Sequence, residues 1–207
     1  MQHNKLTALV ITILLFGVAA CTKQAEATKS ESLFKPTASI QEIMNSIIDP
    51  NADDVWNSVA SVSTAAGVED KKPATDEEWA AVRHHAITLL EASNLLLIDG
   101  RRVAAEGAST SSTPAESGPK EIQKAIDAKR PDFIQHAHEL HDAAQLAVVA
   151  IDAKNAEDLL KAGGVIDHVC EQCHKQFWYP QDKRPTASLD LGLQSGNGLY
   201  LKMRKAT

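Results

Sequence analysis

Aromatic residues are scarce in this chain of 207 residues, in which four Phe, three Trp and two Tyr make up 4% of the sequence. Gly and Pro are also few, with ten and eight residues, and most of them separate longer periodic segments. Ala is plentiful and has the highest helix propensity of the amino acids. No stretch gives a strand signal that rivals the helical ones. The composition therefore favours packed helices.

The chain also has no excess of positive charge. It has 21 Lys and Arg residues against 27 Asp and Glu, which gives a net charge of −6 at pH 7 with His neutral. This mildly acidic balance argues against nucleic-acid binding, which depends on basic contacts to phosphate. The apolar run at Leu6–Phe16 is too short, and wrongly flanked, for a membrane-spanning helix.

Residues 1–20 instead have the features of a secretory signal peptide: a basic start, the apolar run and small residues at its end. The sequence Val18-Ala19-Ala20-Cys21 resembles the lipobox of bacterial lipoproteins. This resemblance implies cleavage before Cys21, lipid on its thiol and amine, and anchorage to a membrane surface. Thr22 in place of Asp implies the outer membrane. Ordinary signal cleavage with Cys21 merely nearby stays open. Residues 21–37 are then the lipidated Cys and a flexible polar tether.

Only two cysteines remain, and both belong to the sequence Cys170-Glu171-Gln172-Cys173-His174. This is C-x-x-C-H, the attachment signature of a c-type haem. Two thiols three residues apart can each add across a haem vinyl group, and the adjacent imidazole can ligate the iron. The motif predicts one covalent haem c on Cys170 and Cys173, with His174 as axial ligand. One Cys for lipid and two for haem leave no odd thiol.

Three different roles for the cysteine pair stay open. A thioredoxin-like dithiol expects a βαβ context, and no such context appears. Half of a zinc site would need a second C-x-x-C, which the sequence lacks. A disulfide between the two thiols would be strained at this spacing and would leave His174 without a role.

The first predicted helix begins at Ser39, because Glu42 follows at the capping-box distance and apolar residues recur at helical spacing. Asp49–Pro50 interrupts the pattern, and a kink or restart is expected there. The apolar face then continues to about Ser63.

Three more main helices and one short helix follow. Capping residues and periodicity place the second, the short, the third and the fourth helix at about 75–98, 120–129, 131–153 and 155–179. Residues 104–118 are rich in Ser, Thr, Gly and Pro and predict a mobile polar loop. Residues 181–207 form a tail without sustained periodicity, whose Leu residues suggest that it lies over the helices.

Sequential helices joined by turns and loops predict an all-α fold, an up-down-up-down four-helix bundle with the C-x-x-C-H haem site in its last helix. On that motif and arrangement, residues 38–180 resemble the cytochrome c′ family, the class II c-type cytochromes. The resemblance implies a four-helix cytochrome domain with its haem near the C-terminal end.

In this topology the end of the fourth helix lies beside the start of the first, so His174 and Met44 are expected at similar heights. Met is a known sixth haem ligand and raises the reduction potential. Typical family members leave the distal side open or block it with an apolar residue, whereas a low-spin branch places a Met near the start of helix one, as here. Two considerations oppose ligation: Asp49–Pro50 could rotate Met44, and a Met at an apolar helical position is commonly core filler.

Other polar residues are candidates for secondary roles. Arg101 and Arg102 could contact the haem propionates, or could simply interact with a solvated helix end. His136, His138 and His141 could offer a surface metal pair or an alternative haem ligand, although solvated helix histidines are the commoner case.

The sequence therefore predicts an electron carrier in which His174 and Met44 ligate one haem and electrons pass between periplasmic redox proteins. The alternative is a high-spin protein that binds nitric oxide or carbon monoxide. No distal His/Arg pair can be placed, so an enzyme such as a peroxidase is not expected. The predicted location is the periplasmic face, lipid-anchored to the outer membrane. The family resemblance also allows a homodimer through the first two helices.

Overall fold

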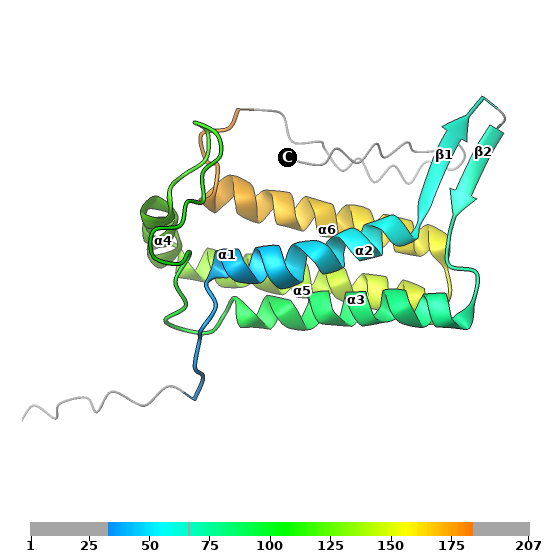
Figure 1. Ribbon diagram of the computed structural model, residues 1–207, viewed down its shortest axis with the longest axis horizontal. Coiled ribbons are helices and arrows are strands. Elements are labelled where there is room, and N and C mark those ends of the chain that lie inside the picture. The colour runs from blue at the N-terminus through cyan, green and yellow to red at the C-terminus, as the bar shows by residue number, and fades with distance from the viewer. Residues whose placement is uncertain (1–32, 66, 184–207) are drawn as a thin grey trace, which may run out of the picture. The chain divides into compact units, whose positions relative to one another are not determined.

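The computed structural model describes residues 33–65 and 67–183, and most of this part of the chain is helical (Figure 1). Contacts divide the chain after Leu33, and the description below concerns the unit that begins at Phe34. The predicted signal peptide, Cys21 and the tail from residue 184 lie outside the described residues. Within the described part, no helix is long and apolar enough to cross a membrane.

The first helical segment consists of α1 (Ile40–Ile43), the π-helical turn η1 (Met44–Ile48) and α2 (Asp49–Ser58). The predicted capping box is confirmed: Ser39 Oγ accepts from the Glu42 N–H at 3.2 Å, and Glu42 Oε2 accepts from the Ser39 N–H at 2.7 Å. The chain stays helical through Asp49–Pro50, but η1 ends at Ile48 and α2 begins at Asp49 with Pro50 in its first turn, which agrees with the expected restart. The helix ends at Ser58, so the predicted extension to Ser63 is wrong.

A β-hairpin follows instead, with β1 (Ala60–Thr64) antiparallel to β2 (Gly67–Lys71) and Ala60 opposite Lys71. Val59 is buried, as its place in the apolar pattern predicted. Its backbone angles are extended (φ −132°, ψ 140°), however, and they end the helix after Ser58. Every residue of β2 is exposed, so β2 has no buried face, and its sequence Gly67–Lys71 carries no apolar–polar alternation.

The later helices agree with the prediction to within a few residues. They are α3 (Asp76–Leu95), α4 (Pro119–Ala128), α5 (Arg130–Asp152) and α6 (Ala156–Phe177). Thr75 and Glu78 form the expected capping box of α3. Asn155 Oδ1 accepts from the Asp158 N–H at 3.1 Å and caps α6. These local signals fixed the helix starts because each cap satisfies backbone N–H groups that the helix itself cannot.

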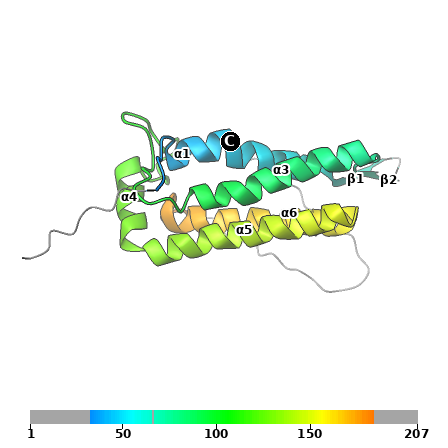
Figure 2. The same cartoon turned by 90° about the horizontal axis from the view of Figure 1, so that it is seen from below.

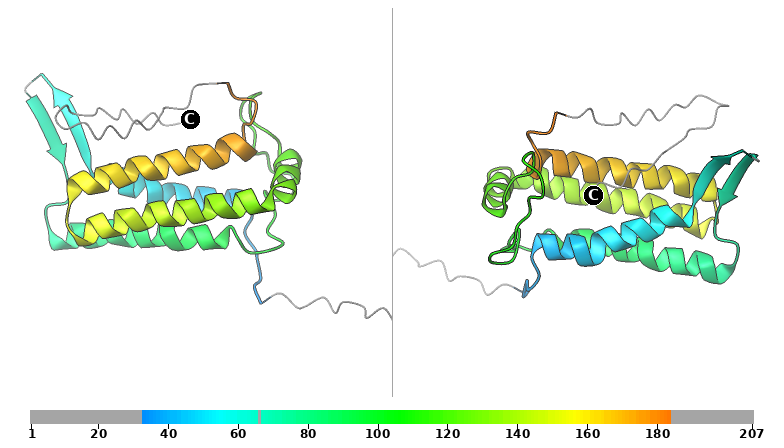
Figure 3. Two further views of the ribbon diagram at one scale, coloured as in Figure 1. Left: turned by 180° about the vertical axis from the view of Figure 1, so that it is seen from behind. Right: turned by 45° about the horizontal axis from the view of Figure 1, so that its top comes forward.

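Helix α5 packs against α3 and α6, and α2 packs against the same two helices. The long segments lie side by side, with α4 across one end and the hairpin at the other (Figures 1 and 2). Figure 3 shows the same arrangement from behind and tilted. Small side chains fill much of the interior and let the helices approach closely; the buried alanines are Ala52, Ala86, Ala92, Ala104, Ala137, Ala143, Ala144, Ala147, Ala150 and Ala162.

Candidate functional site

A cavity of about 150 Å³ lies between the start of the first helical segment and the end of α6. Met44 of η1 and Cys173 and His174 of α6 line it together. Most of the remaining walls are apolar, among them Ile40, Val103, Ile122, Ile126, Phe133 and Phe177. The structure thus brings the predicted sixth ligand and the predicted axial ligand to one apolar space.

The two cysteines of α6 are free thiols. Burial raises the pKa of both thiols to about 12. A negative charge on Cys173 raises the pKa of Cys170 further, and the charge of Glu139 does the same for Cys173. Both groups are therefore protonated at neutral pH. Redox-active dithiols have lowered pKa values, so the raised pKa values of these thiols do not favour a thioredoxin-like pair.

Burial lowers the pKa of His174, against the opposing charge of Glu171. A neutral imidazole can offer a nitrogen lone pair to a metal, which an imidazolium cannot. The Trp178 ring packs edge-on against the His174 ring, with centroids 5.0 Å apart, and the Tyr179 centroid lies at 6.1 Å. The Tyr179 hydroxyl donates to Glu171 Oε2 at 2.5 Å. The imidazole is half-buried and packs against the two aromatic residues that follow at its own helix end.

The loop at residues 104–118 lies beside the cavity and is hydrogen-bonded to residues at the end of α6 and in α1. Trp178 Nε1 donates to the Thr110 carbonyl at 2.6 Å, and the Ser117 N–H donates to the Trp178 carbonyl at 2.7 Å. Gln41 Nε2 donates to the Ser109 carbonyl at 2.7 Å. Thr110 itself lines the cavity. Sequence reasoning predicted a mobile loop and missed these contacts, because backbone acceptors leave no signature in a sequence.

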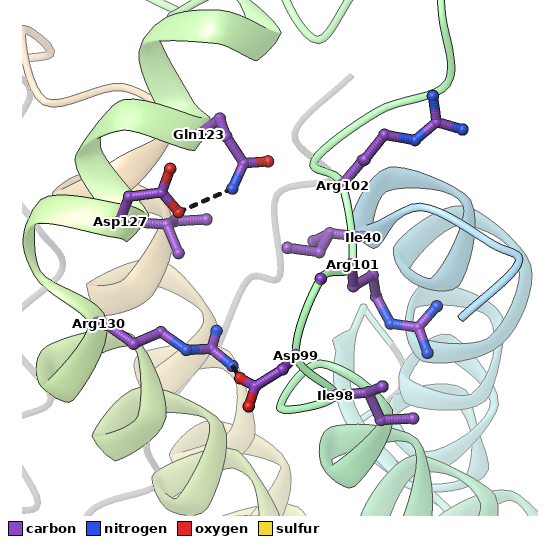
Figure 4. A pocket seen from close by; sticks show the side chains of 10 residues that line it. Ile40, Ile98, Asp99, Arg101, Arg102, Gln123, Asp127 and Arg130 are labelled. Atoms are coloured by element: carbon purple, nitrogen blue, oxygen red, sulfur yellow. Dashed lines mark hydrogen bonds and ion pairs between the residues drawn. The ribbon is translucent and has the colours of Figure 1, made fainter. Parts of the chain in front are cut away.

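The predicted arginines line a second cavity, of about 360 Å³, which shares Ile40 and Ile126 with the first (Figure 4). Arg101 Nε donates to the Leu95 carbonyl at 2.7 Å, and its Nη1 donates to the Ala38 carbonyl. The Arg101 guanidinium therefore binds one carbonyl at the C-terminal end of α3, which is the helix-end role considered for it above, and one in the segment before α1. Arg102 is exposed.

Arg130, which sequence reasoning missed, also lines the second cavity. Its Nη2 donates to the Leu97 carbonyl at 2.9 Å and to Asp99 Oδ1 at 3.2 Å (Figure 4). Its guanidinium also lies over the Phe133 ring, 5.5 Å from the centroid. Charged side chains thus gather beside the apolar cavity.

The histidines of α5 have different surroundings. The His136 side chain is only 14% exposed and is hydrogen-bonded at both nitrogens, to Glu139 and Gln176, each at 2.9 Å. His138 is exposed, and His141 lies 3.3 Å from Asp142. His136 is therefore not a solvated helix histidine. No group of three or more His, Cys, Asp or Glu side chains that could hold a metal ion exists among residues 33–65 and 67–183.

No protein-family model, curated protein or solved structure matches the chain. Assignment therefore depends on the chemistry of the site.

The Cys173 thiol, the His174 imidazole and the Met44 thioether line the cavity, whereas Cys170 does not. The other walls are mostly apolar, with four polar side chains among them, Gln41, Asn45, Asp49 and Thr110. A thiol, an imidazole and a thioether are groups that suit a covalently attached haem. The cavity is smaller than the roughly 300–1,000 Å³ usual for small-molecule sites. A haem would enter only as the lining side chains move apart.

Proposed function

We propose that this protein is a c-type cytochrome of the cytochrome c′ kind that carries single electrons. The observation that carries the proposal is that Met44 and the Cys173–His174 end of the C-x-x-C-H motif line one apolar cavity. Cys170 and Cys173 would hold the haem by thioether bonds, each sulfur adding to one vinyl carbon while the thiol hydrogen passes to the other. His174 would be the axial ligand and Met44 the sixth. When bound, the haem supplies one-electron redox chemistry.

The side chains would set the properties of such a centre in three ways. His174 is held neutral by burial, so its ligating nitrogen needs no deprotonation. The apolar walls, with Thr110 of the 104–118 loop, would limit the contact of the haem with water, which disfavours the more highly charged oxidised state. The thioether of Met44 also favours the reduced state. The apolar walls and the Met44 thioether would both raise the reduction potential.

The proposal extends to the architecture. Helices α2, α3, α5 and α6 would form the up-down-up-down four-helix bundle of the family, since each packs against the neighbours that this connectivity requires. Arg101 and Arg102 stay candidates for propionate contacts, because their cavity adjoins the first through Ile40 and Ile126.

The proposed location is the periplasmic face of the outer membrane, with a lipid on Cys21 and periplasmic redox proteins as partners. A homodimer through the first two helices is part of the same family-based proposal. Replacing Cys21 with Ala should release the protein from the membrane fraction into the soluble fraction, and retention in the membrane would contradict the lipid anchor.

The test is an optical spectrum of the haem-loaded mature protein in both oxidation states. We expect a low-spin wild type, a high-spin Met44→Ala variant and an unchanged Met203→Ala control. A wild type that is already high-spin, binds carbon monoxide freely and is unaffected by Met44→Ala would favour the gas-binding alternative. A chain that takes up no covalent haem in a host with haem-attachment machinery would overturn the proposal.

A further inference from the structure

The first helical segment buries its residues in a pattern that an uninterrupted α-helix does not produce. Ile48, Ala52 and Val55 are 2%, 2% and 1% exposed and lie four and three residues apart, as on one stripe of an α-helix. Continued backwards, this stripe would include Met44, four residues before Ile48. Instead Ile43 is 2% exposed, whereas Met44 is only partly buried and lines the cavity.

The π-helical turn η1 accounts for this shift. Within it the Asp49 N–H donates to the Met44 carbonyl, five residues back instead of the four of an α-helix. One extra residue in the turn moves the preceding residues by one position, roughly 100° of rotation, relative to α2. Ile43 then takes the core place that α-helical geometry would give Met44. Met44 then faces the cavity, which Asn45 also lines.

Two features of the sequence favour the wide turn. Ile43 and Ile48 are five residues apart and are each 2% exposed. In an α-helix they would lie roughly 140° apart, at the two edges of an apolar face, whereas a π turn brings them onto one stripe. Pro50 has no N–H, and in an α-helix its ring collides with the carbonyl four residues earlier, that of Ser46. A wider turn before Pro50 gives the ring room. Asn51 Nδ2 donates to the Ile47 carbonyl at 2.7 Å and supplies a side-chain donor to a main-chain acceptor of the same turn.

We propose that η1 and Pro50 are a positioning device that takes Met44 out of the core and presents it to the cavity opposite His174. The ligand role of Met44 rests on the proposed function, but its placement does not, because the register is set by Ile43, Pro50 and the extra residue of the turn. Met44 is thus only partly buried and packs against the edge of the core, instead of filling the core position that Ile43 occupies.

Two variants test whether the π turn sets the position of Met44 on the helix. One should keep Met44 at the cavity, and the other should move it into the core. Deleting the exposed Ser46 together with Pro50→Ala removes the extra residue and the proline. Ile43 and Ile48 are then four apart, so an ordinary α-helix keeps Met44 at the cavity. The second variant, Ile43→Gln with Pro50→Ala, keeps the length of the chain. It removes both features that favour the π turn, the buried isoleucine and the proline. The helix should then become α throughout and Met44 should move into the core.

The readout without haem is the methyl resonance of Met44 in methionine-labelled protein. We expect contacts with Phe177 and Trp178 and a large ring-current shift in the wild type and in the deletion variant, and their loss in the Ile43→Gln variant. After haem loading, the first two proteins should be low-spin and the third high-spin although Met44 is still present.

The outcomes separate the two proposals. If the deletion variant loses the Met44 contacts, or the Ile43→Gln variant keeps them, the register inference is overturned while a low-spin wild type still supports the cytochrome. If the contacts follow the expected pattern but no haem binds, the register inference stands and the proposed function fails.

Discussion

Trp56 and Gly163 form a direct contact between the two helices that carry Met44 and His174. Trp56 Nε1 donates to the Gly163 carbonyl at 2.9 Å. A Cβ on residue 163 would lie 3.1 Å from Trp56 Cδ1 and 3.6 Å from its Nε1. Glycine therefore lets the indole lie directly on the backbone of α6, and Gly163→Ala would push it away.

The expected effect of Gly163→Ala follows from three opposing contributions. Alanine gains about 1 kcal/mol of helix propensity over glycine. Overpacking against the indole costs about 1–3 kcal/mol, and loss of the Trp56 hydrogen bond costs about 1 kcal/mol. The substitution should therefore lower the free energy of unfolding by about 1–3 kcal/mol, although alanine is the better helix former.

Urea unfolding of the haem-free protein, followed by circular dichroism, measures this change. In a Trp56→Leu background the indole is gone, so Gly163→Ala should instead stabilise by about 1 kcal/mol. Equal stabilisation in both backgrounds would refute the reasoning. In the haem-loaded protein, separation of α2 from α6 should also weaken Met44 ligation and increase the high-spin fraction.

Two further predictions concern the site. Trp178→Phe keeps a ring beside His174 but removes the donor to the Thr110 carbonyl, so the free energy of unfolding should fall by about 1 kcal/mol. Amide hydrogen exchange should also become faster across residues 104–118. Unchanged protection of these amides would show that other contacts hold the loop. The pKa of Cys170 and of Cys173 is about 12 in the folded protein, against an ordinary value of 9.0. Their contribution to stability is therefore complete below about pH 9 and is lost as the pH rises towards 12. Urea midpoints of the haem-free protein should decline over this range, and a Cys170→Ser/Cys173→Ser variant should lack that part of the decline.

The helix starts could be predicted from the sequence because their determinants are local. Ser39, Thr75 and Asn155 each cap a helix by accepting from a backbone N–H three residues later, so a short window contains the whole signal. The hairpin could not be predicted, since β2 has no buried face and hence no alternation. The π turn was also missed, because the apolar residues of this stretch follow the i, i+3, i+4, i+7, i+8 spacing of an ordinary α-helix; they are Ile40, Ile43, Met44, Ile47 and Ile48.

The candidate site was predictable in part for a different reason. The C-x-x-C-H motif is contiguous, and chain connectivity alone was enough to expect Met44 and His174 at one height. The hydrogen bonds that hold the 104–118 loop beside the site were not predictable. The Trp178–Thr110 and Gln41–Ser109 hydrogen bonds join residues far apart in the sequence through main-chain acceptors, which any residue type provides.

The walls of the cavity come from the beginning, the middle and the end of the described chain: Met44, Thr110 and His174. No partly folded form that lacks either terminal helix can contain it, so the cavity disappears whenever either helix detaches. A molecule bound there would by mass action stabilise the whole cooperative unit and not one segment. A bond from Met44 to a group already attached to α6 would also close a loop spanning most of the chain, and would do so reversibly. Breaking and remaking that bond would change the conformational entropy of the unfolded ensemble without altering any packing between the helices.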